Sequence, residues 1–135
     1  MKTGCFNWYK EKNGVAICLR PPVSYKGERF KELSPPLKTF IAIKNNKINH
    51  QQYEYEYRNL ILSKLDPIEI YHMFDGKVLL CWEEPLFDAS TNNIVNSGTG
   101  FCHRHIVSSW IFESLGVRIE EWRKNEKSSP SIKLF

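Results

Sequence analysis

The sequence predicts a single three-layer α/β domain with a mostly parallel sheet flanked by helices. Short apolar runs rich in β-branched residues alternate with stretches of helical spacing, which is typical of a parallel sheet. The strongest run, residues 78–82, is apolar on both faces, so we expect it to be a central strand. A helix start precedes it, because Asp66 can cap a helix and Pro67 suits its first position.

The N-terminal half should contribute two strands and two helices. Each strand is a short apolar run, and the second is stopped by consecutive prolines. Each helix shows apolar residues at helical spacing, and the polar residues 23–36 form a long loop before the first helix. These expected elements are strands over residues 3–8 and 14–19 and helices over residues 37–44 and 51–65.

The C-terminal half should continue with helix, strand, loop and helix. Gly76 suits the left-handed exit of the helix that begins after Asp66, and Gly116 lies just past the end of the last helix. The stretch after the central strand is rich in Asn, Ser, Thr and Gly, which is typical of a loop. These expected elements are a helix to about residue 74, a strand over 78–82, a loop over 84–100, a helix over 101–115 and a short edge strand over 117–122.

The chain of 135 residues is long enough to bury a core without disulfides. We expect one domain over residues 1–122 and a flexible C-terminal tail over residues 123–135. No apolar run approaches the roughly 18 residues of a membrane span, and the N-terminus lacks the apolar core of a signal peptide. We therefore expect a cytoplasmic protein with no membrane partner, in which the four cysteines are free thiols.

The net charge of +4 is spread over the sequence, with lysines scattered among glutamates. A dedicated nucleic-acid-binding protein usually carries a basic stripe and a more extreme isoelectric point than 8.9. The charge pattern therefore favours a solvated surface, and nucleic acid stays an alternative partner.

The end of the predicted central strand and the start of the following helix together form the candidate site. The strand leads into Cys81 and Glu83, and the helix begins around Cys102, His103 and Arg104. In α/β proteins such a junction binds anions, because the first N–H groups of the helix are unpaired and its dipole favours negative charge. We therefore expect an anionic, nucleotide-like ligand here.

Each side chain at this junction has a chemical role that suits such a ligand. Arg104 would hold the anion, and Glu83 or His103 would move a proton. The pKa of Cys102 should fall at the helix start, so this thiol would be the nucleophile or a polarised donor. The alternatives are packing roles for the cysteines and an ion pair of Arg104 with a neighbouring glutamate.

Further ligand-binding candidates lie at the strand end and in the long N-terminal loop. Cys81 would face the ligand from the end of the central strand. Tyr25 and Lys26 could stack on a nucleotide and neutralise its charge, and Arg20 could point to the same mouth. Plain solvent exposure explains these three loop residues equally well.

We expect no metal site and no cofactor. No C-x₂-C pair is present, and neighbouring side chains of the Cys102-His103-Arg104-His105 stretch lie about 100° apart on a helix. The P-loop, dinucleotide-binding and nucleophile-elbow motifs are also missing from the sequence.

Three functions agree with these residues. The first is a small protein that binds an anionic, nucleotide-like ligand, with catalysis possible at the same site. The second is a non-catalytic module that binds or sequesters a nucleotide, a nucleic acid or a host protein. The third is a thiol redox protein, which requires Cys81 and Cys102 to lie close enough to bridge. The sequence leaves the oligomeric state open.

Four parts of the chain carry a resemblance to a known family. They are Ala16-Ile17-Cys18 with Tyr25-Lys26-Gly27, Leu62-Ser63-Lys64-Leu65-Asp66-Pro67, Val78-Leu79-Leu80-Cys81-Trp82-Glu83, and Phe101-Cys102-His103-Arg104-His105. In this order they resemble a family of short bacterial and phage proteins, the domain-of-unknown-function family four hundred and eighty-eight. The resemblance spans about residues 3 to 122.

The resemblance implies a single α/β domain with a flavodoxin-like or related sheet, without an established reaction. It makes Cys81, Glu83, Cys102, His103 and Arg104 the signature positions of this chain. The chain departs from the family pattern between the two halves of the signature, where residues 85–100 replace a connection of a few residues. We expect this insertion to cap or restrict the pocket.

Overall fold

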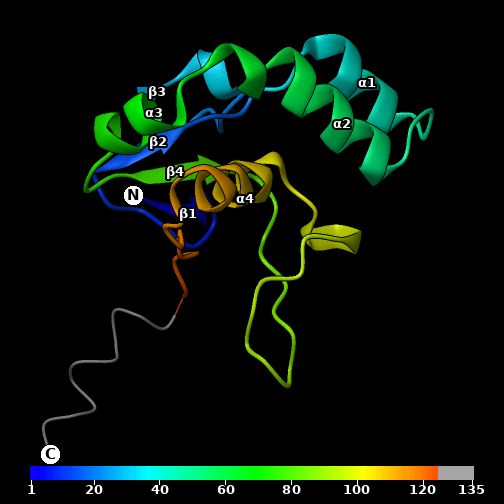
Figure 1. Ribbon diagram of the computed structural model, residues 1–135. Coiled ribbons are helices and arrows are strands. Elements are labelled where there is room, and N and C mark those ends of the chain that lie inside the picture. Colours follow the sequence, from blue (N-terminus) through cyan, green and yellow to red (C-terminus); the bar gives the residue numbers. More distant parts are fainter. Residues whose placement is uncertain (125–135) are drawn as a thin grey trace, which may run out of the picture.

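The computed structural model describes residues 1–124, which contain a four-stranded, all-parallel sheet and four α-helices (Figure 1). The prediction of a three-layer α/β fold with a parallel sheet is confirmed. The strand order across the sheet is β1-β4-β2-β3. The strands are β1 (Lys2–Cys5), β2 (Gly14–Ala16), β3 (Glu28–Arg29) and β4 (Val78–Cys81).

Strand β4 is central, as its continuous apolar run predicts. It pairs with β1 on one side, where Cys5 lies opposite Cys81, and with β2 on the other, where Ala16 lies opposite Leu80. All four of its residues are buried. A strand buried on both faces must be apolar throughout, which is the physical reason why the sequence identifies it.

The four helices begin and end at residues whose chemistry suits those positions. They are α1 (Leu37–Lys44), α2 (His50–Leu60), α3 (Pro67–Met73) and α4 (His103–Leu115). Asn49 and Gln52 form a reciprocal capping box at α2, and Asp66 caps α3. Gly116 ends α4 with a φ of 72°, the left-handed conformation that glycine adopts without strain. Along the described part of the chain, no helix combines the length and the apolar character of a membrane span.

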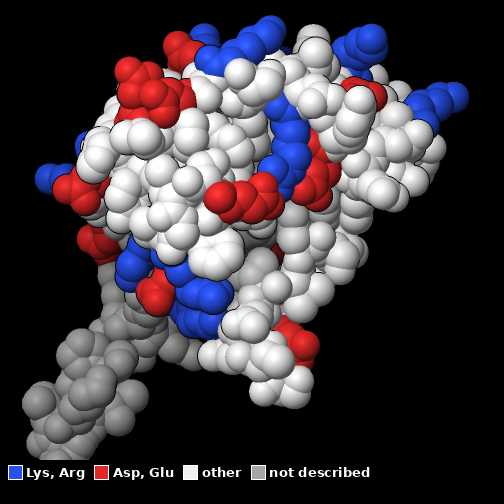
Figure 2. All heavy atoms as spheres, in the orientation of Figure 1, with Lys and Arg blue, Asp and Glu red and all other residues white. Residues whose placement is uncertain are grey.

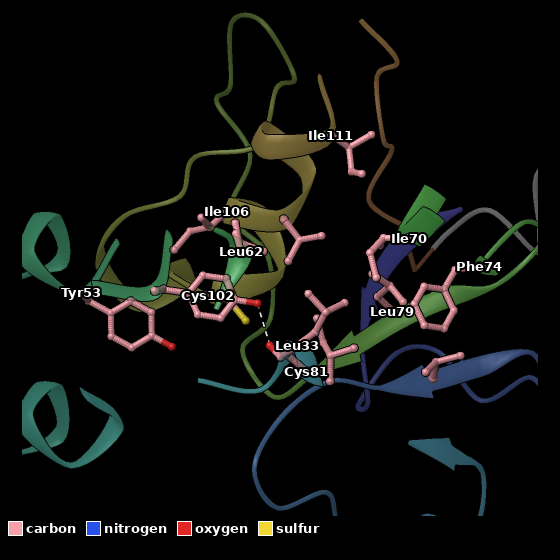
Figure 3. Packing of buried hydrophobic residues seen from close by; sticks show 14 residues of the cluster. Leu33, Tyr53, Leu62, Ile70, Phe74, Leu79, Cys81, Cys102, Ile106 and Ile111 are labelled. Atoms are coloured by element: carbon pink, nitrogen blue, oxygen red, sulfur yellow. Dashed lines mark hydrogen bonds between the residues drawn. The ribbon is translucent and has the colours of Figure 1, made fainter. Parts of the chain in front are cut away.

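One face of the sheet packs against the helices and forms the larger core. Leu79 and Cys81 of β4 lie in it (Figure 3), and Val15 of β2 belongs to the same cluster. The Tyr57 hydroxyl donates a hydrogen bond of 2.6 Å to the carbonyl of Leu33, which satisfies the one polar atom that this ring buries. The helical residues of this core are Tyr53, Tyr57, Ile70, Ile106, Val107 and Ile111.

The other face is covered by loops, and these form the third layer. Val78 and Leu80 of β4 pack there against the aromatic rings of Phe6, Tyr9 and Trp122. Phe6 and Tyr9 belong to residues 6–13, which connect β1 to β2 across the intervening β4. This connection is too short for the usual crossover helix of a parallel sheet, so its aromatic side chains cover the strands instead.

Four expected elements of the N-terminal half differ from the structure, and two of them are the strands, which end early at Cys5 and Ala16. The polar stretch 23–36 contains the edge strand β3 and a 3-10 turn, Lys31–Leu33. Both residues of β3 are exposed, so the strand has no apolar alternation for sequence reasoning to detect. The helix expected over residues 51–65 stops at Leu60, and a separate 3-10 turn, Leu62–Lys64, continues the chain.

The segment after α4 contains less regular structure than expected. Instead of an edge strand over residues 117–122, a single parallel bridge joins Glu121 to Thr3 of β1. Two backbone hydrogen bonds flank the bridge, from Thr3 N to Glu120 O and from Trp122 N to Thr3 O. Of the expected flexible tail, residues 123 and 124 are described, whereas residues 125–135 lie outside the described part of the chain.

Truncation of the central strand tests this core. We expect Leu79→Ala to lower the free energy of unfolding by about 2–5 kcal/mol, because the fully buried side chain would leave a cavity. Leu60→Ala is the matched control, since its side chain is 45% exposed, and it should change stability by less than about 1 kcal/mol. Urea unfolding of both variants measures the difference. Equal losses would contradict the packing described for β4.

Candidate functional site

The carboxyl end of β4 meets the N-terminus of α4 at a cavity of about 290 Å³. The chain leaves the sheet after Cys81, makes a long excursion, and returns to begin α4 at His103 (Figure 1). Four predicted site residues line this cavity: Cys81, Glu83, Cys102 and His103. Figure 3 shows Cys81 and Cys102, which are twenty-one positions apart in the chain, in the same buried region. The junction predicted from the sequence is therefore a cavity with converging side chains.

The imidazole of His103 is held in one orientation by the backbone. Its Nε2 lies 2.7 Å from the carbonyl oxygen of Ile17 and donates a hydrogen bond to it. In the neutral ring the other nitrogen, Nδ1, then carries the lone pair. Nδ1 lies 3.7 Å from the sulfur of Cys81 and 4.0 Å from the sulfur of Cys102. The Cys81 sulfur also lies 3.5 Å from Nε2, so it lies beside the ring and near both nitrogens.

These two sulfurs and Nδ1 all lie within 4.8 Å of one another. We call Cys81, Cys102 and His103 the thiol cluster. All three residues are buried, and all four cysteines of the chain are free. The expectation of no metal site rested on the lack of a C-x₂-C pair and on the divergence of neighbouring side chains over residues 102–105. Cys81 lies in β4, so the spacing of side chains along α4 does not determine where its sulfur lies. Together the three residues offer three donor atoms for a metal ion.

The two thiols of the cluster differ in pKa. Burial raises the pKa of Cys102, but a hydrogen bond with Cys81 and the positive charge of Arg104 outweigh burial and hold this pKa well below its usual range. Burial and the neighbouring Cys102 raise the pKa of the Cys81 thiol. Of the two thiols, Cys102 is therefore the one whose environment favours the thiolate form.

Glu83 lies half-buried on the wall of the same cavity. Burial raises the pKa of its carboxyl, and the neighbouring Cys102 raises it further. Glu84 lies on the surface, where it accepts a hydrogen bond from the Asn7 side chain. The strand end therefore directs one of the two consecutive carboxylates into the cavity.

The opposite wall of the cavity contains residues that sequence reasoning missed. Lys44 is the last residue of α1 and is exposed, and His50 is the first residue of α2. The ring of His50 stacks on Phe101, with centroids 3.9 Å apart and planes 5° from parallel. Nothing local marks these residues in the sequence, because only the packing of α1 and α2 brings them to the cavity.

Arg104 has a different role from the anion clamp that we expected. Its side chain is fully buried and does not line the cavity. Nε and Nη2 donate to the two carboxylate oxygens of Glu121 at 3.1 and 2.8 Å, and Nη2 also donates to the carbonyl of Glu83 at 2.8 Å. A buried guanidinium without a paired anion is strongly destabilising. Arg104 therefore binds the carboxylate of Glu121, where we expected it to bind a ligand.

Glu121 is the centre of this buried polar group. Besides Arg104, it accepts hydrogen bonds from the Thr3 hydroxyl at 2.7 Å and from His105 Nε2 at 3.1 Å. Burial raises the pKa of Glu121, but hydrogen bonds from His105 and Arg104 outweigh burial and lower it to about 2. His105 therefore contributes to a buried hydrogen-bond network.

The remaining ligand-binding candidates do not line the cavity. The Tyr25 hydroxyl donates to the carbonyl of Glu28 at 2.6 Å, and its ring packs on Phe6 in the core cluster of the other sheet face. Arg20 and Lys26 are exposed, and the carbonyl of Arg20 accepts a hydrogen bond from the indole of Trp82. The loop that carries these residues thus supports the sheet.

The inserted residues 85–100 contribute directly to the site. Gly98 and Thr99 line the cavity, and the Asn96 side chain accepts a hydrogen bond of 2.8 Å from the backbone N–H of Cys102. The insertion therefore both borders the cavity, as expected, and fixes the backbone at the start of α4.

Comparison with known proteins yields no match: no protein-family model, no curated protein and no solved structure matches this chain significantly. Membership in the domain-of-unknown-function family therefore stays a prediction.

Removal of one partner of the buried ion pair should be costly. We expect Glu121→Gln to lower the free energy of unfolding by about 3–5 kcal/mol, because it leaves the Arg104 charge buried and uncompensated. Glu113→Gln is the matched control, because Glu113 pairs with Arg58 at the surface, and it should cost less than about 1 kcal/mol. Denaturant unfolding at neutral pH compares the two variants. Equal losses of unfolding free energy would show that the buried ion pair matters no more to stability than the surface pair.

The same carboxylate predicts how stability depends on pH. The pKa of Glu121 is about 2 in the folded protein and 4.5 in its ordinary state. Its stabilising contribution is therefore fully present above about pH 4.5 and is lost as the pH falls toward 2. Unfolding measured across this range should show the wild type and Glu121→Gln converging. A difference that stays constant would contradict the ionised, paired state of Glu121.

Proposed function

We propose that this protein is an enzyme that binds a small anionic, nucleotide-like ligand in the cavity between β4 and α4. The observation that carries the proposal is the convergence of a carboxyl group, two thiols and an imidazole on one cavity at a strand end and a helix N-terminus. A cavity with a few convergent polar and titratable groups is the usual form of a small-molecule site.

Two features of the cavity favour an anionic ligand, although Arg104, the predicted anion clamp, does not line it. Lys44 provides a cation on the cavity wall, and the cavity lies at the N-terminus of α4, where the helix dipole favours negative charge. The stacked rings of His50 and Phe101 add a planar aromatic surface on the same wall, which suits a nucleobase. The cavity volume lies near the lower end of about 300–1,000 Å³ for small-molecule sites, which favours a monomeric ligand.

The chemistry of the site would centre on the thiol cluster. Cys102, whose pKa is held low, would be the nucleophile, and Glu83 would move a proton at the same cavity. His103 is a positioning residue, because its hydrogen bond to Ile17 orients the ring beside both sulfurs. Arg104 acts indirectly, since it holds the start of α4 and its charge stabilises the Cys102 thiolate.

Thiol redox chemistry is the second candidate function, and one observation favours it. The sulfurs of Cys81 and Cys102 lie within 4.8 Å, so a modest movement would bring them to the bond length of about 2.05 Å. Mild oxidation of the folded protein should then remove two of the four titratable thiols.

Nucleic acid is less favoured as the ligand. On the face shown in Figure 2, Lys and Arg side chains are interleaved with Asp and Glu and form no continuous basic stripe. Binding of a nucleic-acid backbone depends on such a stripe, because phosphate contacts dominate the affinity.

A thermal-shift screen against nucleotides, cyclic nucleotides and sugar phosphates tests the proposal. A ligand at 100 times its Kd should stabilise the protein by about 2.7 kcal/mol, which raises the Tm by several degrees. Lys44→Ala should weaken this effect, whereas Lys38→Ala, in the same helix but outside the cavity, should leave it unchanged. Lack of stabilisation by any anionic compound would contradict the proposal.

Catalysis is tested separately with the ligand that binds. Cys102→Ser and Glu83→Gln should keep the fold and abolish turnover, measured by product analysis. A ligand that binds the wild type without conversion would show a non-catalytic binding module instead.

A further inference from the structure

We propose that Cys81, Cys102 and His103 bind one Zn²⁺ ion, whose fourth coordination position opens into the cavity. Two thiolates and one imidazole with an open position form a donor set typical of catalytic zinc. The donors come from two elements, the end of β4 and the start of α4, which the sheet and its core hold together.

The distances between the donor atoms suit a tetrahedral ion. Zinc bonds of about 2.3 Å to sulfur and about 2.0 Å to nitrogen place sulfur and nitrogen about 3.5 Å apart, and two sulfurs about 3.8 Å apart. Nδ1 of His103 lies 3.7 and 4.0 Å from the two sulfurs, and all three atoms lie within 4.8 Å. Movements of an ångström or less, within the reach of side-chain rotation, would complete the geometry.

The hydrogen bond from His103 to Ile17 is the second argument. Histidines that bind zinc commonly donate their other ring nitrogen to a carbonyl or a carboxylate, which fixes the tautomer and the ring orientation. Here Nε2 donates to the Ile17 carbonyl at 2.7 Å, and the Nδ1 lone pair is left for the ion. The outer contact of a zinc ligand is therefore already formed.

Charge balance is the third argument. Two thiolates and a neutral imidazole cancel the 2+ charge of zinc, so the ion adds no net charge to a buried site. Without the ion, the second thiolate would be an uncompensated buried charge beside the first.

The position of the cavity gives the ion a role, and this role rests on the proposed function. Water or a ligand oxygen at the fourth position would face Glu83, which lines the same cavity and could take or return a proton. Cys102 would then act as a zinc ligand, and the ion would be the reactive centre of the cluster.

Titration of the metal-free protein with Co²⁺ tests the site, because cobalt reports its ligands and geometry by absorption. We expect one Co²⁺ per chain, a sulfur-to-cobalt charge-transfer band, and the intense visible bands of four-coordinate cobalt. Zn²⁺ should abolish this spectrum by displacement. This measurement uses the wild type alone, so it does not depend on whether any variant folds. Binding without the charge-transfer band would overturn the proposal, since the thiolates would not be ligands.

Variants then locate the ion. Cys81→Ser, Cys102→Ser and His103→Gln should weaken Zn²⁺ binding, measured by competition with a chromophoric chelator. The loss should exceed the 10- to 100-fold or so that follows from removal of an outer hydrogen-bond partner. Cys18→Ser and His50→Gln are matched controls, because both residues line the cavity but lie outside the cluster. Equal losses in the controls would overturn the assignment.

The two proposals fail in distinguishable ways. If an anionic ligand stabilises the protein and cobalt does not bind, the metal site is wrong and the proposed function stands as metal-free thiol chemistry. If cobalt binds as expected and no ligand is found, the metal site stands and the proposed function is wrong.

Discussion

The buried ion pair between Arg104 and Glu121 is the constraint on which the site depends. It joins the first turn of α4 to the segment after that helix, to Thr3 of β1, and through the Glu83 carbonyl to the end of β4. Cys102 and His103 directly precede Arg104. Their positions relative to Cys81 therefore follow from how this guanidinium is held.

This arrangement divides the cavity into two walls of different character. The wall formed by Cys81, Cys102 and His103 is buried, and each polar group there has a partner among the described residues. The wall formed by Lys44 and residues 98–99 is exposed and belongs to a helix end and a loop. Catalytic groups work best on a rigid wall, whereas ligand-binding groups are often carried by loops. The buried wall therefore suits chemistry, and the exposed wall suits ligand binding.

The sequence predicts the parts of this site that depend on local pattern and general topology. β4, the Asp66 cap of α3 and the Gly116 end of α4 have strong local signals. Parallel strands bring a strand end next to a helix start, so the cavity residues of β4 and α4 could be placed together. The partner of Arg104 could not be predicted, because Glu121 lies seventeen residues away in a segment with little regular structure. The cavity residues Lys44 and His50 also depend on tertiary packing, which leaves no mark in the neighbouring residues.

The start of α4 conflicts with what folding alone requires. Cys102, His103, Arg104 and His105 are all buried, in a place where aliphatic side chains would extend the core that Ile106 and Val107 begin. Replacement of a buried ion pair by apolar residues of similar volume is often neutral or stabilising, so stability does not explain Arg104 and Glu121. The proposed site would supply a reason, because directed hydrogen bonds to Glu121, Ile17 and Asn96 set position and orientation in a way that apolar contacts do not. In this proposal the buried ion pair gives up stability so that the three donor atoms of the thiol cluster are held within 4.8 Å of one another beside an open cavity.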